Sequence, residues 1–184
     1  MPTVTIRPDS TVSAGNWSVA DANIPGQIND QNDSTTVSNI TPNQSFLVEL
    51  DDPGVTASSY DLGEVTIRAS KTGKGSSVDF TVEVYIGTSL HHSKSLTTSS
   101  SSIVALSSGG FTFPGGFNDS DSNTLRVGIT TVNNTQGSFA EVSMAINYTE
   151  ATGYGQNVNT VSAANIGKIN SVATASIGKV NSVN

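Results

Sequence analysis

Three oxygen-bearing side chains, Asp119, Asp121 and Asn123, stand at every second position of one segment. The first ligands of a calcium-binding loop have this spacing. The pattern then departs from such a loop, because Thr124 stands where the loop has its invariant glycine and Thr130 where it has its bidentate glutamate. Asp119, Asp121 and Asn123 are the candidate metal ligands of the sequence, and the two departures favour a solvated turn without a resident metal.

The remaining residues with catalytic potential do not form a recognisable site. His91 and His92 are adjacent, and neighbours on a strand point to opposite faces, so we expect two separate surface side chains. The segment 71–75 (KTGKG) lacks the spacing of a phosphate-binding loop, and no helix pattern follows it. The chain has no cysteine, and no Ser-His-Asp set or carboxylate pair is indicated. We therefore expect a protein that is not an enzyme and needs no cofactor.

Charge and composition narrow the classes of partner. Of the 184 residues only 12% are charged, and Ser, Thr, Asn and Gly take their place, as is typical of an all-β domain rich in turns. Residues 1–150 hold all 15 acidic and 6 of the 8 basic residues, a net charge of −9, whereas 151–184 carries +2. An acidic body argues against nucleic acid as ligand. No apolar run has the length of a membrane span, and the N-terminus has no signal-peptide core, so we expect synthesis in the cytoplasm.

Short segments of alternating polarity predict β-strands throughout residues 1–150. The clearest is 78–86, where every second residue is apolar over nine positions. Pro8 is expected to end the first strand, and 133–137 to form a hairpin turn. The polar segment 88–102 is either an edge strand or a long loop. The expected strands are 3–7, 17–19, 35–40, 46–50, 64–68, 78–86, 103–106, 111–113, 125–131 and 139–148.

Nine or ten such strands separated by Gly, Pro and Asn predict an antiparallel β-sandwich. We favour a jelly-roll-like topology over an immunoglobulin-like one, with Trp17 as a core anchor. The domain is expected to cover 1–150, and 151–184 to be a linker and an extended C-terminal arm.

The arm is built from a repeat. The segment IGKINSV at 166–172 recurs as IGKVNSV at 177–183, an offset of 11, and 158–161 is a degenerate third copy. Gly, Asn, Ser and the β-branched residues disfavour a helix, and an odd period disfavours one long strand. Short extended pieces remain, whose apolar residues need a surface on another chain. The expected partner-binding residues are Val158, Val161, Ile166, Lys168, Ile169, Val172, Ile177, Lys179, Val180 and Val183.

Both ends of the chain carry a resemblance. The opening TIRPDSTVSAGNW at 5–17, the Asp-rich loop after it, the strand ending AINY and the IGKVNSV repeat resemble structural proteins of tailed bacteriophages, of the capsid decoration, cement or head-fibre type. The resemblance implies a virion component on the outer surface of the particle. Its partners would be the major capsid protein and copies of itself.

The main functional expectation is therefore a non-enzymatic capsid decoration protein that stabilises the shell through contacts between subunits, with a homotrimer favoured. The alternatives are a neck or tail fibre, a spike, or a glycan-binding adhesin module. A sugar site would need an exposed aromatic side chain beside Asp or Asn, and Trp17, Tyr60 and Tyr85 are the candidates.

Overall fold

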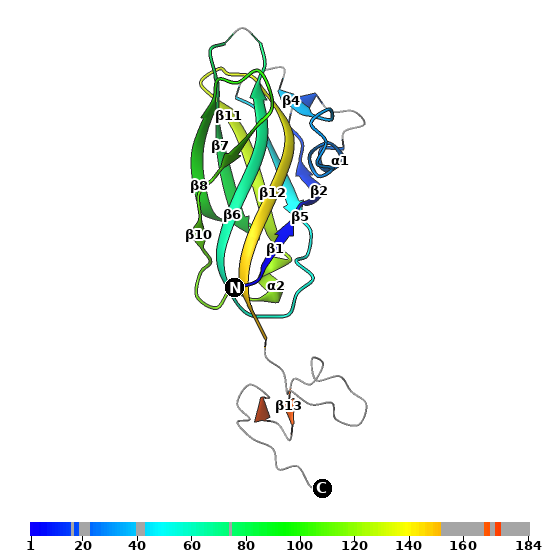
Figure 1. The fold of residues 1–184 in the computed structure, drawn as a ribbon, viewed down its shortest axis with the longest axis vertical. Helices are drawn as coiled ribbons and strands as arrows, with labels where there is room; N and C mark the ends of the chain where they lie inside the picture. The colour runs from blue at the N-terminus through cyan, green and yellow to red at the C-terminus, as the bar shows by residue number, and fades with distance from the viewer. Residues whose placement is uncertain are drawn as a thin grey trace.

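The computed structural model describes residues 1–15, 17–18, 23–39, 43–73, 75–151, 168–169 and 172–173. Its main body consists of two antiparallel sheets packed face to face around one core (Figure 1). Within the described residues, sheet A has seven strands and sheet B has five. The predicted all-β, jelly-roll-like sandwich is confirmed.

Sheet A is centred on its two longest strands, which pair along most of their lengths. The order is β10-β6-β12-β4-β3, and β1 pairs with β12 while β9 pairs with β6. The strands are β1 (Thr3–Ile6), β3 (Trp17–Ser18), β4 (Val37–Asn39), β6 (Ala57–Lys71), β9 (Val104–Ser107), β10 (Phe111–Thr112) and β12 (Gly137–Glu150).

Sheet B has the order β2-β5-β11-β7-β8. Its strands are β2 (Pro8–Ser13), β5 (Ser45–Leu50), β7 (Val78–Ile86), β8 (Ser89–Thr98) and β11 (Leu125–Val132). β7 has the predicted bounds, because Val78, Phe80, Val82 and Val84 all face the core with no exposed surface. Most of the polar segment 88–102, for which the sequence allowed either an edge strand or a long loop, forms β8, an edge strand of sheet B.

A predicted strand end and a predicted turn are both places where the chain passes between the sheets. The first strand, β1, ends before Pro8 as predicted, but Pro8 also begins a further strand, β2, since a proline is tolerated as the first residue of an edge strand. The chain thus leaves sheet A after Ile6 and enters sheet B at Pro8. The predicted hairpin at 133–137 joins β11 of sheet B to β12 of sheet A, and Asn133 and Asn134 have positive φ there (57° and 56°).

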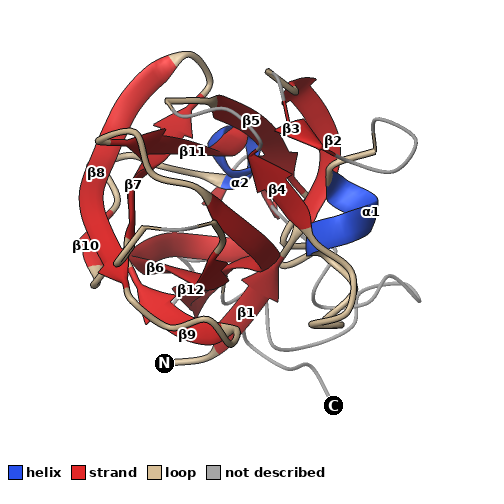
Figure 2. Ribbon diagram, turned by 90° about the horizontal axis from the view of Figure 1, so that it is seen from above, coloured by secondary structure: helices blue, strands red, loops and turns tan. Residues whose placement is uncertain are grey.

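Two short helices occur in segments predicted as loops. α1 (Pro25–Ile28) lies beside β2 and β12 at one side of the sandwich (Figures 1 and 2). Ile24 and Ile28 there have no exposed surface. α2 (Asp119–Ser122) lies at the end of the sandwich near the N-terminus (Figure 1). Helices of four residues are too short for a periodic signal. Neither of these two helices, nor any other helix of the described residues, is long and apolar enough to cross a membrane.

Two aromatic clusters fill the space between the sheets. In the first, Trp17 packs edge-on against Phe46 and Phe139, with ring centroids 4.9 and 5.4 Å apart. Trp17 is 8% exposed, which confirms it as a core anchor. The second cluster consists of Tyr60, Phe111, Phe113 and Phe117.

Little of the C-terminal arm belongs to the described residues. β13 (Lys168–Ile169) and β14 (Val172–Ala173) form a short antiparallel pair. The other expected partner-binding residues lie outside the described part of the chain, so their role stays a prediction. They are Val158, Val161, Ile166, Ile177, Lys179, Val180 and Val183.

Candidate functional site

The outer face of sheet B carries a compact group of side chains supplied by three neighbouring strands. Alternate residues of a strand share a face, so the register of β5, β11 and β7 determines which side chains are neighbours on this face. The first row is Leu47, Gly128 and Glu83, and the next is Glu49, Arg126 and Tyr85.

A hollow of about 250 Å³ lies over the first of these rows. Gly128 contributes no side chain to its floor, and a Cβ at this position would make ordinary van der Waals contacts, none nearer than 3.5 Å. Its nearest neighbours would be Leu47 Cδ1, Tyr85 Cε2 and Glu83 Oε2. The hollow is lined by Ser13, Ser45, Phe46, Leu47, Glu83, Tyr85, Gly128 and Thr130.

Tyr85 and Glu83 form a fixed pair at one wall. The Tyr85 hydroxyl donates a hydrogen bond to Glu83 Oε2 at 3.0 Å. Burial raises the pKa of Tyr85, and the hydrogen bond and negative charge of Glu83 raise it further. The phenol therefore stays protonated at neutral pH, and its half-buried ring borders the hollow.

Arg126, in the row beside the hollow, is already engaged. Its Nε donates to Glu49 Oε2 at 3.0 Å, and its Nη1 donates to the Gly87 carbonyl at 3.2 Å. The guanidinium thus braces β11 against the strands on both sides.

Of the three aromatic residues proposed for a sugar site, the structure leaves one at a surface hollow. Trp17 and Tyr60 are 8% and 6% exposed and belong to the aromatic clusters of the core. Tyr85 lines the hollow. The sequence did not single out Gly128, although a glycine inside a strand can mark a place where a ligand approaches closely.

The candidate metal ligands have other partners. Asp121 caps the start of α2 by accepting from the Asn118 backbone amide at 3.1 Å. Asp119 Oδ1 accepts from the Tyr60 hydroxyl at 2.7 Å. With its side-chain amide assigned so that the nitrogen faces Asp52, Asn123 donates to both carboxylate oxygens of Asp52 at 3.1 and 3.2 Å. The expected turn is thus a capped helical turn, which the spacing of Asn118 and Asp121 could have indicated. No group of three or more His, Cys, Asp or Glu in the described chain is arranged to hold a metal.

The expectation that His91 and His92 point apart is wrong. A β-bulge opposes Leu90 and His92 of β8 to consecutive residues of β7, which leaves His91 as the extra residue. Both rings then contact Phe111, with centroids 5.8 and 4.7 Å away. His91 Nε2 also lies 2.8 Å from the Thr112 carbonyl. The two rings therefore join β8 to β10, at the second aromatic cluster.

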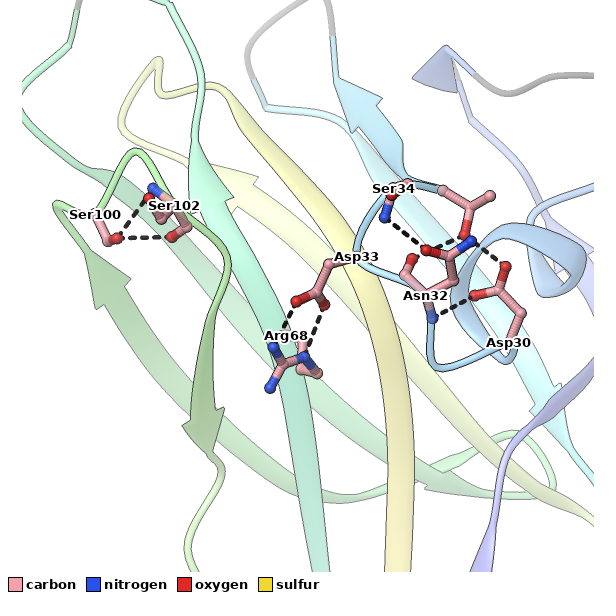
Figure 3. A network of polar contacts seen from close by, with 8 residues as sticks. Asp30, Asn32, Asp33, Ser34, Arg68, Ser100 and Ser102 are labelled. Atoms are coloured by element: carbon pink, nitrogen blue, oxygen red, sulfur yellow. Dashed lines mark hydrogen bonds and ion pairs between the residues drawn. The ribbon is translucent and has the colours of Figure 1, made fainter.

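The outer face of sheet A is occupied differently. A loop at 30–35 is held together by its own polar side chains, and Asp33 reaches from it to Arg68 on β6 (Figure 3). Arg68 donates to both carboxylate oxygens of Asp33, at 2.9 and 2.7 Å. Arg7 and Glu141 form a further ion pair at 3.4 Å.

A larger hollow of about 440 Å³ lies where β1 passes into β2. Its polar groups mostly serve local structure. Asn29 Nδ2 donates to the Pro8 carbonyl at 3.0 Å, and Asp52 Oδ1 accepts from the Gly54 amide at 2.9 Å. No aromatic side chain is among the residues that line it.

No protein-family model and no curated protein matches the chain. Among solved structures, it is similar to the C-terminal CBM6 of LamC, a marine laminarinase from Zobellia galactanivorans, at 9% identity and a TM-score of 0.42, covering 79% of this chain and 100% of that one. A CBM22-1–GH10 structure of the Clostridium thermocellum xylanase Xyn10B matches at 12% identity and a TM-score of 0.46, over 89% of this chain and 30% of that one.

A third match is the Stig cyclase Fisc from Fischerella sp. TAU, at 12% identity and a TM-score of 0.40, over 81% of this chain and 100% of that chain. Carbohydrate-binding modules and a cyclase thus both superpose on this sandwich. At TM-scores below 0.5 these likenesses carry no inference about ligand or activity. What the chain binds has to be argued from its own side chains.

Proposed function

We propose that residues 1–150 form a non-catalytic glycan-binding module whose site is the hollow on the outer face of sheet B. The observation that carries the proposal is Tyr85, whose ring stands beside Gly128 in the lining of the hollow. A sugar ring has apolar C–H faces and a rim of hydroxyl groups, so it needs apolar and aromatic surface next to fixed hydrogen-bonding groups.

The hollow offers both kinds of surface. Tyr85 and Leu47 supply apolar contact, and Gly128 adds no side chain of its own to the floor between them. Around them Glu83 can accept hydrogen bonds from sugar hydroxyls, while Ser45 and Thr130 can donate or accept.

The residues that line the hollow also favour binding of a glycan over its hydrolysis. Glycoside hydrolases use two carboxyl groups on either side of the scissile bond. Among the residues that line the hollow, Glu83 is the single carboxylate. The other residues that line the hollow supply no second carboxylate, which supports a binding module.

The test is calorimetry of the full chain against a panel of soluble neutral oligosaccharides and polysaccharides. We expect Tyr85→Ala to weaken binding roughly 30-fold or more, the effect of removing an aromatic hot spot. Leu62→Ala is the matched control, because it removes exposed apolar surface (Leu62 is 40% exposed) from β6 of the other sheet. A panel without any binding, or binding indifferent to Tyr85→Ala, would refute the site.

A second proposal concerns residues 151–184 and rests on the 11-residue repeat and on the +2 charge beside a body of −9. We propose that this arm attaches the module to neighbouring chains, as in a virion decoration or fibre protein. Deletion of 157–184 should lower the oligomeric mass in solution and abolish binding to particles, while glycan binding persists. Unchanged mass and particle binding after the deletion would contradict it.

A further inference from the structure

The charges around the hollow are unevenly balanced. Glu83 lies in its wall, and its structural partner is the neutral Tyr85 hydroxyl rather than a cation. Among the described residues, its negative charge is therefore not neutralised by a counterion at contact distance. A second carboxylate on the same strand, Asp79, accepts from Thr97 at 2.8 Å and from Asn133 at 3.3 Å, again neutral groups.

The positively charged side chain on this face is already paired within the protein. Arg126 is the basic residue that the register places on the outer face of the described β5, β11 and β7. Its guanidinium is paired with Glu49, and another of its N–H groups donates to Gly87. A ligand carboxylate or sulfate would have to displace Glu49 to gain a salt bridge. The four charged residues of this face, Glu49, Asp79, Glu83 and Arg126, sum to a formal charge of −2.

We infer that the hollow selects uncharged glycans and rejects those bearing uronate or sulfate groups, with Glu83 as the specificity-determining residue. The inference rests on the proposed function and narrows its ligand class. The hydroxyl groups of a neutral sugar can donate hydrogen bonds to the Glu83 carboxylate, and such charge-assisted hydrogen bonds are favourable. An acidic sugar brings a second negative charge into the same half-buried space, where Arg126, the basic residue on this face of the described β5, β11 and β7, is already paired with Glu49.

A matched ligand pair tests the selectivity. The neutral polymers of the panel are compared with the same polymers after oxidation of their primary hydroxyl groups to carboxylates. We expect the oxidised forms to bind roughly tenfold or more weakly at low salt, the scale of one like-charge contact near a protein surface. The difference should shrink as the salt concentration rises.

Glu83→Gln tests the residue. Glutamine keeps an oxygen that can accept from Tyr85 but loses the charge, so the oxidised polymers should regain most of the lost affinity. Glu64→Gln is the control, because Glu64 lies on β6 of sheet A and the substitution changes the net charge by the same amount. Recovery in Glu83→Gln alone supports the inference, whereas equal recovery in both variants would assign the effect to the overall charge.

The outcomes separate the two proposals. Equal or tighter binding of the oxidised polymers by the native protein would overturn the selectivity and leave the glycan site standing. If Glu83→Gln still rejected the oxidised polymers, Glu83 would not be the residue that determines the specificity. Absence of binding to every neutral polymer would overturn the proposed function and the selectivity with it.

Discussion

Gly63 in β6 and Gly128 in β11 are both interior strand residues, one in each sheet, and the space beside them is used in opposite ways. A Cβ at Gly63 would lie 2.5 Å from Phe111 Cζ and 3.0 Å from Phe113 Cζ. A Cβ at Gly128 would meet nothing closer than 3.5 Å. Aromatic rings of the protein fill the first space, and the second opens into the hollow on sheet B.

The contrast extends to the two outer faces of the sandwich. On sheet A, Asp33 reaches from a loop to Arg68. On sheet B, Tyr85 borders an open hollow. Side chains that satisfy one another serve stability, whereas an aromatic ring beside empty space is available to a ligand.

The largest effect on stability is expected from Gly63→Ala. The new methyl group would overlap the rings of Phe111 and Phe113, and overpacking of this kind costs ~1–3 kcal/mol. Urea unfolding followed by tryptophan fluorescence measures the loss. Gly110→Ala is the control, because a Cβ there would have no neighbour within 4 Å. Equal stability of the two variants would mean that the aromatic rings can move to accommodate the new methyl group at little cost in free energy.

Tyr60→Phe probes the polar edge of the same cluster. The Tyr60 hydroxyl donates to Asp119 at 2.7 Å, and loss of such a bond costs about 1 kcal/mol. Burial, first of all, raises the pKa of Tyr60 to about 12. Because the folded pKa is raised, this contribution is complete below the ordinary value of 10 and is lost as the pH rises toward 12.

Unfolding free energies of the native protein and Tyr60→Phe, measured from pH 8 upward, check this prediction. The gap between the two proteins should be largest near neutral pH and should close at alkaline pH. A difference in unfolding free energy that stays constant through this range would show that ionisation of the Tyr60 hydroxyl is not coupled to unfolding.

The sequence predicted those elements that depend on local alternation and missed those that depend on pairing. β7 was predicted with its true bounds because one face of it is wholly apolar. β2 was missed because Pro8 is as compatible with an edge strand as with a stop. The bulge that turns His91 is likewise set by the partner strand.

The candidate site shows the same limit. Tyr85 could be named from its type, but Leu47, Gly128 and Glu83 come from three strands that are far apart in the sequence. Only the register β5-β11-β7 makes them neighbours. A single sequence holds no direct record of register between distant strands.

Gly128→Ala is expected to stabilise the fold and to weaken the binding of the ligand. The new Cβ makes ordinary van der Waals contacts of 3.5–3.6 Å, so the smaller entropy of the unfolded chain should add ~0.4–1 kcal/mol to stability. The same methyl group narrows the floor of the hollow and should lower the affinity for neutral glycans several-fold. Gly115→Ala serves as control, since nothing lies within 4 Å of a Cβ there and it is remote from the hollow. Unchanged binding in Gly128→Ala would mean that the ligand does not reach this floor.

The smallest effect is expected from Asp33→Asn on sheet A. The hydrogen bond from Arg68, foremost, lowers the pKa of Asp33 below its ordinary value of 3.8. Because the folded pKa is lowered, the stabilisation is present above 3.8 and is lost as the pH falls through the folded value. Both side chains are accessible to solvent, so salt should also screen the attraction.

Thermal unfolding of the native protein and Asp33→Asn at neutral pH should therefore differ slightly at low salt, and the difference should vanish in high salt or once the pH has fallen below the lowered pKa of Asp33. A large loss that persists in high salt would mean that Asp33 holds the 30–35 loop on sheet A by more than charge. Glycan binding separates the two faces, because it should be the same in both proteins. If Asp33→Asn gained affinity for the neutral polymers, a face freed of its own contacts would bind sugar as well as the hollow does, and the distinction between the two sheets would fall.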